Sequence, residues 1–397
     1  MIKPELLAPA GDLEKLKIAI LYGADAIFIG GREYGLRANA SNFSVDEIKE
    51  ACEFAHSHGA KVYVTTNIFF HNENLTGFDD YIITLTKIGV DAFICADIFA
   101  INKIRNVSNV DIHLSTQQSV MNSYGINFFK KLGVTRIVLA RECNLDEIKL
   151  LQKRSNMELE VFIHGSMCIG FSGRCMLSNH MTARDANRGG CSQNCRWEYD
   201  ILIDEDNVSD KFGRFSMNPD DLSQCTYIKE LCDINISSLK IEGRMRSIYY
   251  IANVVNVYRT IIDKVYVGED INLEYYQKEL FKSANRNISP QYLDGIPSYI
   301  MQNFGGRDES PSKDFCGLVI DYKNNMLVLE QRNYFEVGEV LEFIRPKQCK
   351  VEITVLKMFN SKMKEIDVAR HPQEIIYIPC EVELFEGCIA RRKENGN

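Results

Sequence analysis

Short apolar runs alternate with amphipathic segments from the start of the chain to about residue 265. At four joints a helical segment ends in a glycine and an apolar run begins two or three residues later, at Gly23, Gly59, Gly89 and Gly133. A glycine just past a helix end adopts the left-handed backbone conformation without a steric penalty, and a β-rich run after it is typical of a parallel strand. The pattern therefore predicts repeated helix–strand units.

Eight strands are expected in this region. They are residues 4–9, 26–30, 61–67, 92–97, 111–117, 136–141, 159–165 and 237–243. Eight parallel strands with intervening helices favour an α/β fold with a closed, TIM-like β/α barrel over an open sheet. Asp12 is a candidate cap of the first helix. The last helix carries an apolar stripe that predicts core packing, made by Ile248, Ile251, Val255, Tyr258 and Ile262.

The spacing of the strands predicts one long insertion in the barrel domain, residues 1–265. About 70 residues separate the seventh strand from the eighth, so 165–236 is expected to be a loop region inserted before strand eight. Long loops within a compact domain are usually functional. The insertion is therefore the first place to look for a site.

Two further segments follow the barrel. Residues 266–312 hold a helical piece around 273–284 and then many turn residues, which predicts a connector. Residues 313–397 alternate apolar and polar positions, with hairpin-like breaks at 323–325 and 337–338. This pattern is typical of a small antiparallel β-barrel.

Composition and charge narrow the function classes. The 397 residues are 45% hydrophobic and 25% charged, and 46 Lys and Arg against 54 Asp and Glu give a formal charge of −8. A global basic field of the kind that binds polyanions nonspecifically is excluded, so a nucleic acid must be met by a local patch. The N-terminus has no apolar leader and no run approaches a membrane span, so a cytoplasmic protein without membrane contact is expected.

Thirteen cysteines in a reducing compartment need an explanation other than a disulfide framework. Nine lie singly among apolar neighbours and are expected to be buried: Cys52, Cys95, Cys143, Cys225, Cys232, Cys316, Cys349, Cys380 and Cys388. The other four fall in one glycine-rich polar stretch of the insertion: Cys168, Cys175, Cys191 and Cys195.

Four thiolates in one glycine-rich loop can hold either tetrahedral zinc or an iron–sulfur cluster. Zinc ribbons favour two pairs with about two intervening residues, whereas the intervals here are six, fifteen and three residues. The spacing favours iron–sulfur, with zinc and a metal-free loop remaining open. The loop leaves the carboxyl end of a strand, which is where β/α barrels place their active sites.

Polar residues follow several strands at this same face. The candidate catalytic residues are Asn67, Gln117, Arg141, His164, Glu242 and Arg244. Arg141, Arg174 and Arg244 are able to hold a dicarboxylate or phosphate in bidentate geometry. Each arginine has a structural alternative, an ion pair with a nearby carboxylate. The peptidase motifs HExxH and GxSxG are absent, and His164 beside Ser166 and Cys168 is the one obvious nucleophile–base proximity.

Four stretches together resemble one known family. They are ELLAPAGDLEKLKIAILYGADAIFIGG, FIHGSMCIGFSGRCMLSNHMTARDANRGGCSQNCRWEY, SSLKIEGRMRS and NYFEVGEVLEF. They resemble the collagenase-like peptidases of family U32, and the similarity runs almost from end to end. Several members of that family look like oxygen-independent hydroxylation proteins with a four-iron cluster. The resemblance implies Cys168, Cys175, Cys191 and Cys195 as ligands of a 4Fe–4S cluster, with Cys232 as a competitor.

The domain composition is most similar to the branch implicated in prephenate-dependent conversion of the wobble uridine of tRNA to 5-hydroxyuridine. The resemblance thus implies prephenate as the hydroxyl donor and a tRNA anticodon loop as partner; it leaves open whether a partner subunit takes part. The C-terminal segment resembles the second domain of elongation-factor-like proteins, which fits an RNA partner. The alternatives are a collagenase-like peptidase, hydroxylation of ribosomal RNA cytidine or a ubiquinone precursor, and a cluster-bearing scaffold without turnover.

Local basic and aromatic residues near the cysteines fit an RNA partner. The candidate substrate-binding residues are Arg174, Arg188, Arg196 and Trp197. Single-stranded RNA is recognised by stacking unpaired bases on aromatic rings and guanidinium planes. Trp197 has an equally good structural role in packing over the cluster.

Overall fold

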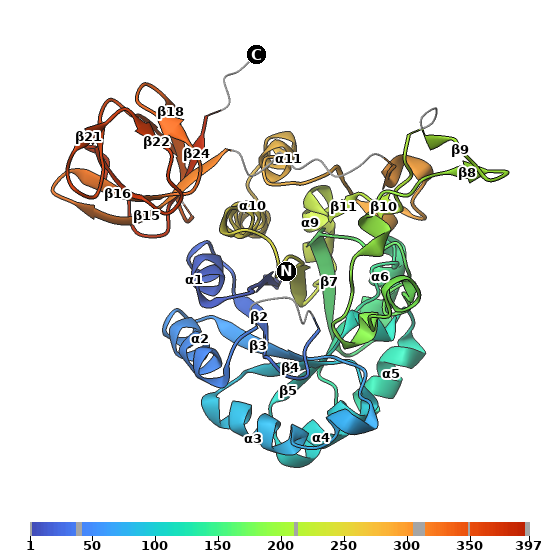
Figure 1. Cartoon of the computed structure of the whole chain (residues 1–397). Helices are drawn as coiled ribbons and strands as arrows, with labels where there is room; N and C mark the ends of the chain where they lie inside the picture. Colours follow the sequence, from blue (N-terminus) through green and yellow to red (C-terminus); the bar gives the residue numbers. More distant parts are fainter. Residues whose placement is uncertain (1, 37–41, 210–212, 305–313, 348–349, 394–397) are drawn as a thin grey trace.

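Eight parallel strands close into a barrel in the computed structural model, which describes residues 2–36, 42–209, 213–304, 314–347 and 350–393 (Figure 1). The strands are β1 (Glu5–Pro9), β2 (Ala26–Gly30), β3 (Lys61–Thr66), β4 (Ala92–Cys95), β5 (Asp111–Leu114), β6 (Arg136–Val138), β7 (Glu158–Gly165) and β12 (Ser238–Ile241). Leu239 of β12 pairs with Leu6 of β1 on one side and with Val161 of β7 on the other. The predicted closed barrel is confirmed.

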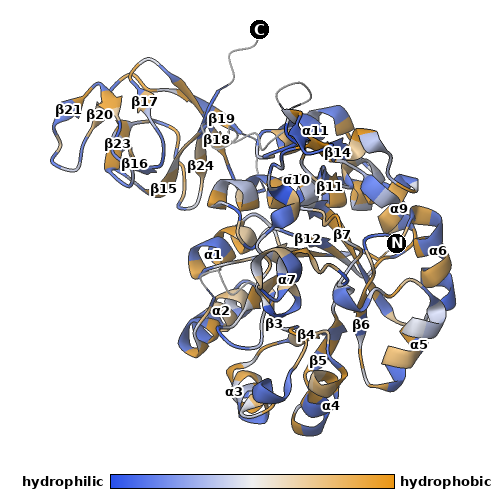
Figure 2. Cartoon of the chain, turned by 45° about the vertical axis from the view of Figure 1, so that its right-hand side comes forward, coloured by the Kyte–Doolittle hydropathy of each residue, from blue (hydrophilic) through white to orange (hydrophobic). Residues whose placement is uncertain are grey.

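Helices surround the barrel. They are α1 (Leu13–Leu21), α2 (Val45–Ser57), α3 (Phe78–Ile88), α4 (Ile98–Val107), α5 (Ser123–Lys131), α6 (Leu145–Arg154), α9 (Ile228–Asp233) and α10 (Ile248–Val267). Asp12 caps α1, because its side chain accepts a hydrogen bond from the Lys15 backbone. The four joint glycines have φ between +73° and +109°, as the helix–strand pattern predicts. The apolar stripe of α10 is buried, and the strands carry the most hydrophobic stretches of the barrel (Figure 2).

The insertion between β7 and β12 is built from short elements. They are α7 (Leu177–Thr182), η3 (Ala186–Arg188), η4 (Asn194–Arg196), β8 (Leu202–Ile203), β9 (Asp206–Asn207), β10 (Asn218–Pro219), β11 (Asp221–Ser223) and η5 (Cys225–Tyr227). Leu222 of β11 pairs with Gly165, so the end of the insertion returns antiparallel to the end of β7. The β8–β9 hairpin projects beyond the barrel (Figure 1).

The segment after α10 adds strands to this insertion. It contains α11 (Leu273–Phe281), β13 (Ile288–Ser289) and β14 (Gln302–Asn303). β13 pairs with β11 and β14 pairs with β10. Residues between the barrel and the C-terminal domain therefore help to frame the barrel mouth.

The C-terminal domain is an antiparallel half-barrel with its own apolar core. Its strands are β15 (Phe315–Lys323), β16 (Met326–Gln331), β17 (Phe335–Glu336), β18 (Val340–Ile344), β19 (Val351–Thr354), β20 (Met358–Phe359), β21 (Glu365–Ile366), β22 (Val368–Ala369), β23 (Ile375–Pro379) and β24 (Ile389–Arg392). The first predicted break is a hairpin turn, since β15 pairs with β16 around Asn324 and Asn325, both at positive φ. The second break, at 337–338, separates strands that pair elsewhere: β17 with β22 and β18 with β19.

The half-barrel packs on the barrel through buried polar contacts. The Tyr22 hydroxyl of α1 lies 2.8 Å from the Ile344 carbonyl oxygen. The Arg391 guanidinium of β24 is buried and lies 2.6 Å from a carboxylate oxygen of Glu279 on α11. Lys350 lies 2.9 Å from the other Glu279 oxygen. One carboxylate of the connecting segment thus holds two cations of the half-barrel.

Among the described residues, no helix combines the length and the apolar character that crossing a membrane requires.

The Glu279 contact predicts acid sensitivity. Burial raises the pKa of this carboxyl, but Arg391 and Lys350 outweigh burial and lower the pKa to about 2. Because the unfolded value is about 4.3, the stabilisation is complete above that pH and is lost as the pH falls from about 4 towards 2. Glu279→Gln is expected to lower the free energy of unfolding at neutral pH by about 3 kcal/mol and to flatten its decline in acid. Urea titrations at stepped pH measure both effects, and identical acid slopes for the variant and the wild type would contradict them.

Candidate functional site

Five of the six predicted catalytic residues line one small cavity at the barrel mouth. They are Asn67, Gln117, Arg141, Glu242 and Arg244. The cavity has a volume of about 130 Å³, and we call it the inner cavity. The carboxyl ends of all parallel strands meet at one face of a barrel, which explains why residues distant in sequence converge here.

A buried amide nitrogen and a buried hydroxyl of the inner cavity have no hydrogen-bond partner among the described residues. The Asn67 side-chain amide donates to Gln117 Oε1 over 2.7 Å, and the Ser115 hydroxyl donates to the same oxygen over 2.9 Å. These two donors fix the Gln117 amide, and its Nε2 is left buried and unsatisfied. Thr65 Oγ1 is also buried without a partner. Buried polar atoms are normally paired, so unsatisfied ones indicate a place for a ligand or water.

Arg141 stands between the inner cavity and a second cavity. Its Nη1 donates to the Ser166 carbonyl over 2.9 Å, and its guanidinium lies 4.0 Å from the centre of the Phe162 ring. Its Nη2 lies 4.0 Å from a Glu242 oxygen, a loose ion pair, and its Nε is buried without a hydrogen bond. Arg141 and Glu242 line both cavities.

His164, the sixth predicted catalytic residue, lines neither cavity. Phe162 opposes Lys240, and the next pair is His164 with Ile241, so β7 carries one extra residue at this point. Such a bulge breaks the side-chain alternation of a strand. His164 contacts α10 instead, with Nδ1 3.2 Å from the Tyr258 hydroxyl, and burial, with a smaller effect of Arg246, lowers its pKa to about 3. The imidazole is therefore neutral and part of the wall between barrel and helix.

Three of the four clustered cysteines line a second cavity, which we call the outer cavity. Its volume is about 310 Å³, and Cys168, Cys191 and Cys195 line it. Burial raises the pKa of the Cys195 thiol, Arg196 lowers it, and the charges of the other three clustered thiols, including Cys175, raise it again. Each of the other three thiols therefore lies close enough to Cys195 to affect the pKa of its thiol. All four thiols are free, and those of Cys168 and Cys191 are exposed.

Four cysteine thiols in one loop are the type of donor that iron–sulfur clusters and zinc take. Across the described ranges, no three His, Cys, Asp or Glu side chains are grouped so as to hold a single metal ion.

Close backbone contacts fix the cysteine loop on the barrel. Gly173 has a φ of +71°, and a Cβ there would lie 2.1 Å from the Gln117 carbonyl oxygen, so the loop touches the residue that follows β5. Arg188 donates to Asn74 over 3.1 Å and also pairs with Glu73, both in the loop after β3. The loop that carries the thiols is thus tied to two loops of the barrel mouth.

The structure places the four predicted substrate-binding residues differently from one another. Arg188 is bound to Asn74 and Glu73. Arg196 donates to the Met167 carbonyl over 2.6 Å and lines the outer cavity. Arg174 is exposed, and 44% of the Trp197 surface is exposed. Only Arg174 and Trp197 therefore present their side chains to solvent.

Sequence reasoning missed a buried charge cluster in the outer cavity. Arg246 Nη2 lies 2.5 Å from Asp221 Oδ2, and Arg286 Nη1 lies 3.3 Å from Asp221 Oδ1. Arg286 also donates to Asn218 over 2.8 Å. Arg286 comes from the expected connector, and no sequence pattern marks it, since its position depends on the long-range pairing of β13 with β11.

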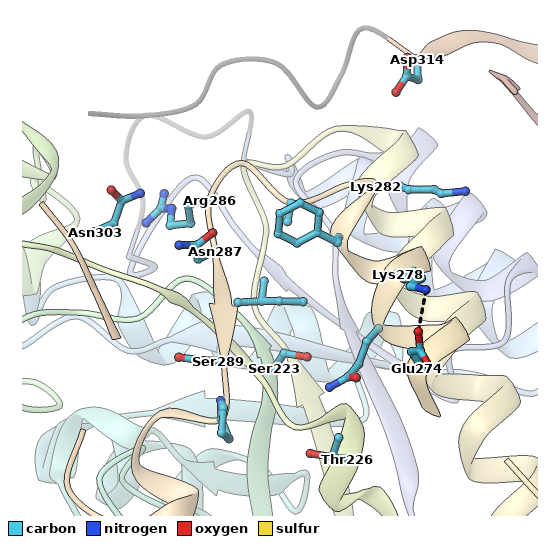
Figure 3. Close-up of a pocket in the computed structure, with 15 residues that line it drawn as sticks. Ser223, Thr226, Glu274, Lys278, Lys282, Arg286, Asn287, Ser289, Asn303 and Asp314 are labelled. Carbon is cyan, nitrogen blue, oxygen red and sulfur yellow. Dashed lines mark hydrogen bonds and ion pairs between the residues drawn. The ribbon is translucent and has the colours of Figure 1, made fainter. Parts of the chain in front are cut away.

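Arg286 also lines a third cavity of about 760 Å³ beside α11 (Figure 3). Lys278 and Lys282 project from α11 on one side, and Asn287 and Asn303 lie near Arg286 on the other (Figure 3). Glu274 lies 2.7 Å from the Lys278 ammonium and neutralises part of this charge. Arg286 is the wall residue shared by this cavity and the outer cavity.

Both parts of the chain match known family models. The sequence model of Peptidase family U32 matches residues 11–303, and that of the Peptidase family U32 C-terminal domain matches residues 311–391. The "tRNA hydroxylation protein P1" of Bacillus subtilis is 47% identical over 98% of this chain and 95% of its own length. The "23S rRNA 5-hydroxycytidine C2501 synthase" of Escherichia coli is 38% identical over 66% of this chain and 39% of its own length. The "Collagenase" of Porphyromonas gingivalis is 29% identical over 82% of each chain.

The site predicts a graded thiol reactivity in metal-free protein. Cys168 and Cys191 are exposed, whereas Cys175 and Cys195 are partly covered. Alkylation with iodoacetamide, followed by peptide mass spectrometry, is expected to label the first pair fastest and the second pair more slowly. Burial raises the pKa of thiols such as Cys95 and Cys225 to about 12, so these should stay unlabelled until the protein unfolds. Early labelling of either would contradict the placement.

Proposed function

The chain belongs to peptidase family U32, and from that premise we propose that it is an oxygen-independent RNA-hydroxylating enzyme, which converts the wobble uridine of tRNA to 5-hydroxyuridine with prephenate as hydroxyl donor. The observation that carries the proposal is the set of four free thiols in one loop at the barrel mouth, three of which line the outer cavity. Proteins with hydroxylation in their names, acting on two kinds of RNA, support the reaction class.

Cys168, Cys175, Cys191 and Cys195 would hold a 4Fe–4S cluster, and an all-cysteine shell is the usual one for such a group. When bound, the cluster supplies a redox centre whose potential responds to nearby charge and hydrogen bonds. Arg196 contributes a positive charge directly beside Cys195, which favours the thiolate form. Arg246 and Arg286, held by Asp221, add further cations to the same wall.

Exposed rings on the cysteine loop support an unpaired base as substrate. The side chains of Phe171 and Trp197 are each 44% exposed, and Arg174 between the first two cysteines is exposed as well. Aromatic rings and guanidinium planes are the surfaces on which proteins stack bases of single-stranded RNA. A loop base is therefore the RNA element that this surface suits.

Peptide hydrolysis receives less support from the geometry. The expected base, His164, is buried against α10 with a pKa of about 3, and it lines neither cavity. A general base must reach the proton that it abstracts and have a pKa near the working pH. His164 meets neither requirement, so the collagenase name of one relative does not extend to this site.

The proposal predicts a specific nucleoside defect. Cells without the gene are expected to lack 5-hydroxyuridine and its derivatives in tRNA, measured by mass spectrometry of hydrolysed tRNA. The wild-type gene should restore these nucleosides, and Cys175→Ser should not. Purified without oxygen, the wild-type protein should carry about four irons per chain and Cys175→Ser fewer.

Cys232→Ser is the matched control. Cys232 is buried on α9, where burial raises its pKa to about 11, so its loss should change neither iron content nor nucleosides. The proposal fails if the deletion leaves the nucleosides unchanged with no second gene covering the loss, or if Cys175→Ser restores them fully.

A further inference from the structure

We infer that the inner cavity is a separate chamber that binds the carboxylate of a small organic acid, with Arg141 as its bidentate anchor. That this acid serves as the hydroxyl donor for a reaction at the thiols rests on the proposed function. That the acid binds here is argued only from the residues that line the inner cavity.

The lining of the inner cavity is electrostatically suited to an anion. Lys240, Arg141 and Arg244 line it with a single carboxylate, that of Glu242. The Lys240 ammonium is held from beneath by Glu160 at 2.8 Å, and Arg244 Nη1 donates to the Leu36 carbonyl at 3.0 Å. Glu160 compensates the Lys240 charge, so the attraction for an anion comes from the Arg141 and Arg244 guanidinium groups, and in a buried site such charge attracts an anion strongly.

One edge of the Arg141 guanidinium has no hydrogen-bond partner among the described residues. The Ser166 carbonyl occupies Nη1, whereas Nε is buried without a hydrogen bond to any described residue and Nη2 has a 4.0 Å contact with Glu242. Nε and Nη2 are the two parallel donors that a carboxylate engages in a bidentate pair. Phe162 packs against the face of the guanidinium and fixes its plane.

Two further polar atoms of the inner cavity are available to bind a carboxylate. Gln117 Nε2 has its orientation set by Asn67 and Ser115, which both donate to its Oε1, and it is buried without a partner. Thr65 Oγ1 is likewise buried without a hydrogen-bond partner among the described residues. A carboxylate offers several acceptor positions, so one bound group is able to satisfy the Arg141 edge and these atoms together. This removes the free-energy penalty of leaving them unpaired.

The volume of the inner cavity limits the size of the ligand that it can bind. Its 130 Å³ correspond to about four water molecules' share of liquid volume, which suits a carboxylate with a few attached atoms. Because Arg141 and Glu242 line both cavities, the rest of a larger acid would extend past them towards the thiols. An acid in the inner cavity would thus lie on one side of Arg141, with the thiols on the other side.

Pyruvate is the probe for the test, with pyruvamide as its uncharged counterpart. Binding to the full-length metal-free protein is measured by calorimetry and ligand-observed NMR. Wild-type protein is expected to bind pyruvate and to bind pyruvamide at least tenfold more weakly. Arg141→Lys keeps the charge but removes the bidentate edge, so it should weaken pyruvate binding about tenfold, which corresponds to about 1.4 kcal/mol. Arg154→Lys, an exposed change on α6, is the matched control and should bind as the wild type does.

Thr65→Val separates ligand binding from folding. The hydroxyl has no partner among the described residues, so replacing it by a methyl group should leave the melting temperature equal or higher while pyruvate binding weakens about threefold. The inference is overturned if wild-type protein does not bind pyruvate, if pyruvamide binds equally well, or if folded Arg141→Lys keeps wild-type affinity. These outcomes do not depend on RNA hydroxylation: lost tRNA modification with intact pyruvate binding would refute the proposed function alone.

Discussion

The pairing of β12 with both β7 and β1 is the contact on which the rest of the structure depends. Leu239 sits between Val161 and Leu6, and this one strand closes the barrel after an insertion of about 70 residues. Closure brings the carboxyl ends of eight strands to one mouth, where Glu242 and Arg244 meet residues from β3, β5 and β6. The insertion must leave and return at this mouth, so its thiols lie beside the polar ends of the strands.

The interior of the barrel explains why the mouth is positively charged. Glu160 is fully buried and lies 2.8 Å from the Lys240 ammonium and 3.4 Å from Arg136 Nη1. Arg136 is also 2.6 Å from Glu5, nearer the amino ends of the strands. Buried ions are tolerated only when paired and hydrogen-bonded, and this chain of charges meets that condition. The carboxylates pair with cations in the lower barrel, while Arg141 lines the inner cavity with an Nε that has no hydrogen bond to a described residue.

The sequence was most informative where local rules apply. Helix–glycine–strand joints marked the barrel units because a glycine at Gly23 or Gly133 serves the same local turn in each unit. Convergence of Asn67, Gln117 and Arg141 was predictable, since it follows from strand direction alone. His164 was not predictable in this way, because one extra residue on β7 turns its side chain outward. Arg286 escaped notice for another reason: the strand beside it pairs with the insertion across more than 60 residues of chain.

The central claim is that the four thiols at this mouth support hydroxylation of RNA. The most direct test is a single-turnover reaction without oxygen, in which cluster-reconstituted protein is mixed with unmodified tRNA and prephenate and the nucleosides are measured by mass spectrometry. The account predicts that 5-hydroxyuridine forms only when tRNA, prephenate and the loaded wild-type protein are all present, and that it is absent with a variant in which Cys168, Cys175, Cys191 and Cys195 are all serine. Equal product from that variant, or no product from fully loaded wild-type protein, would contradict it.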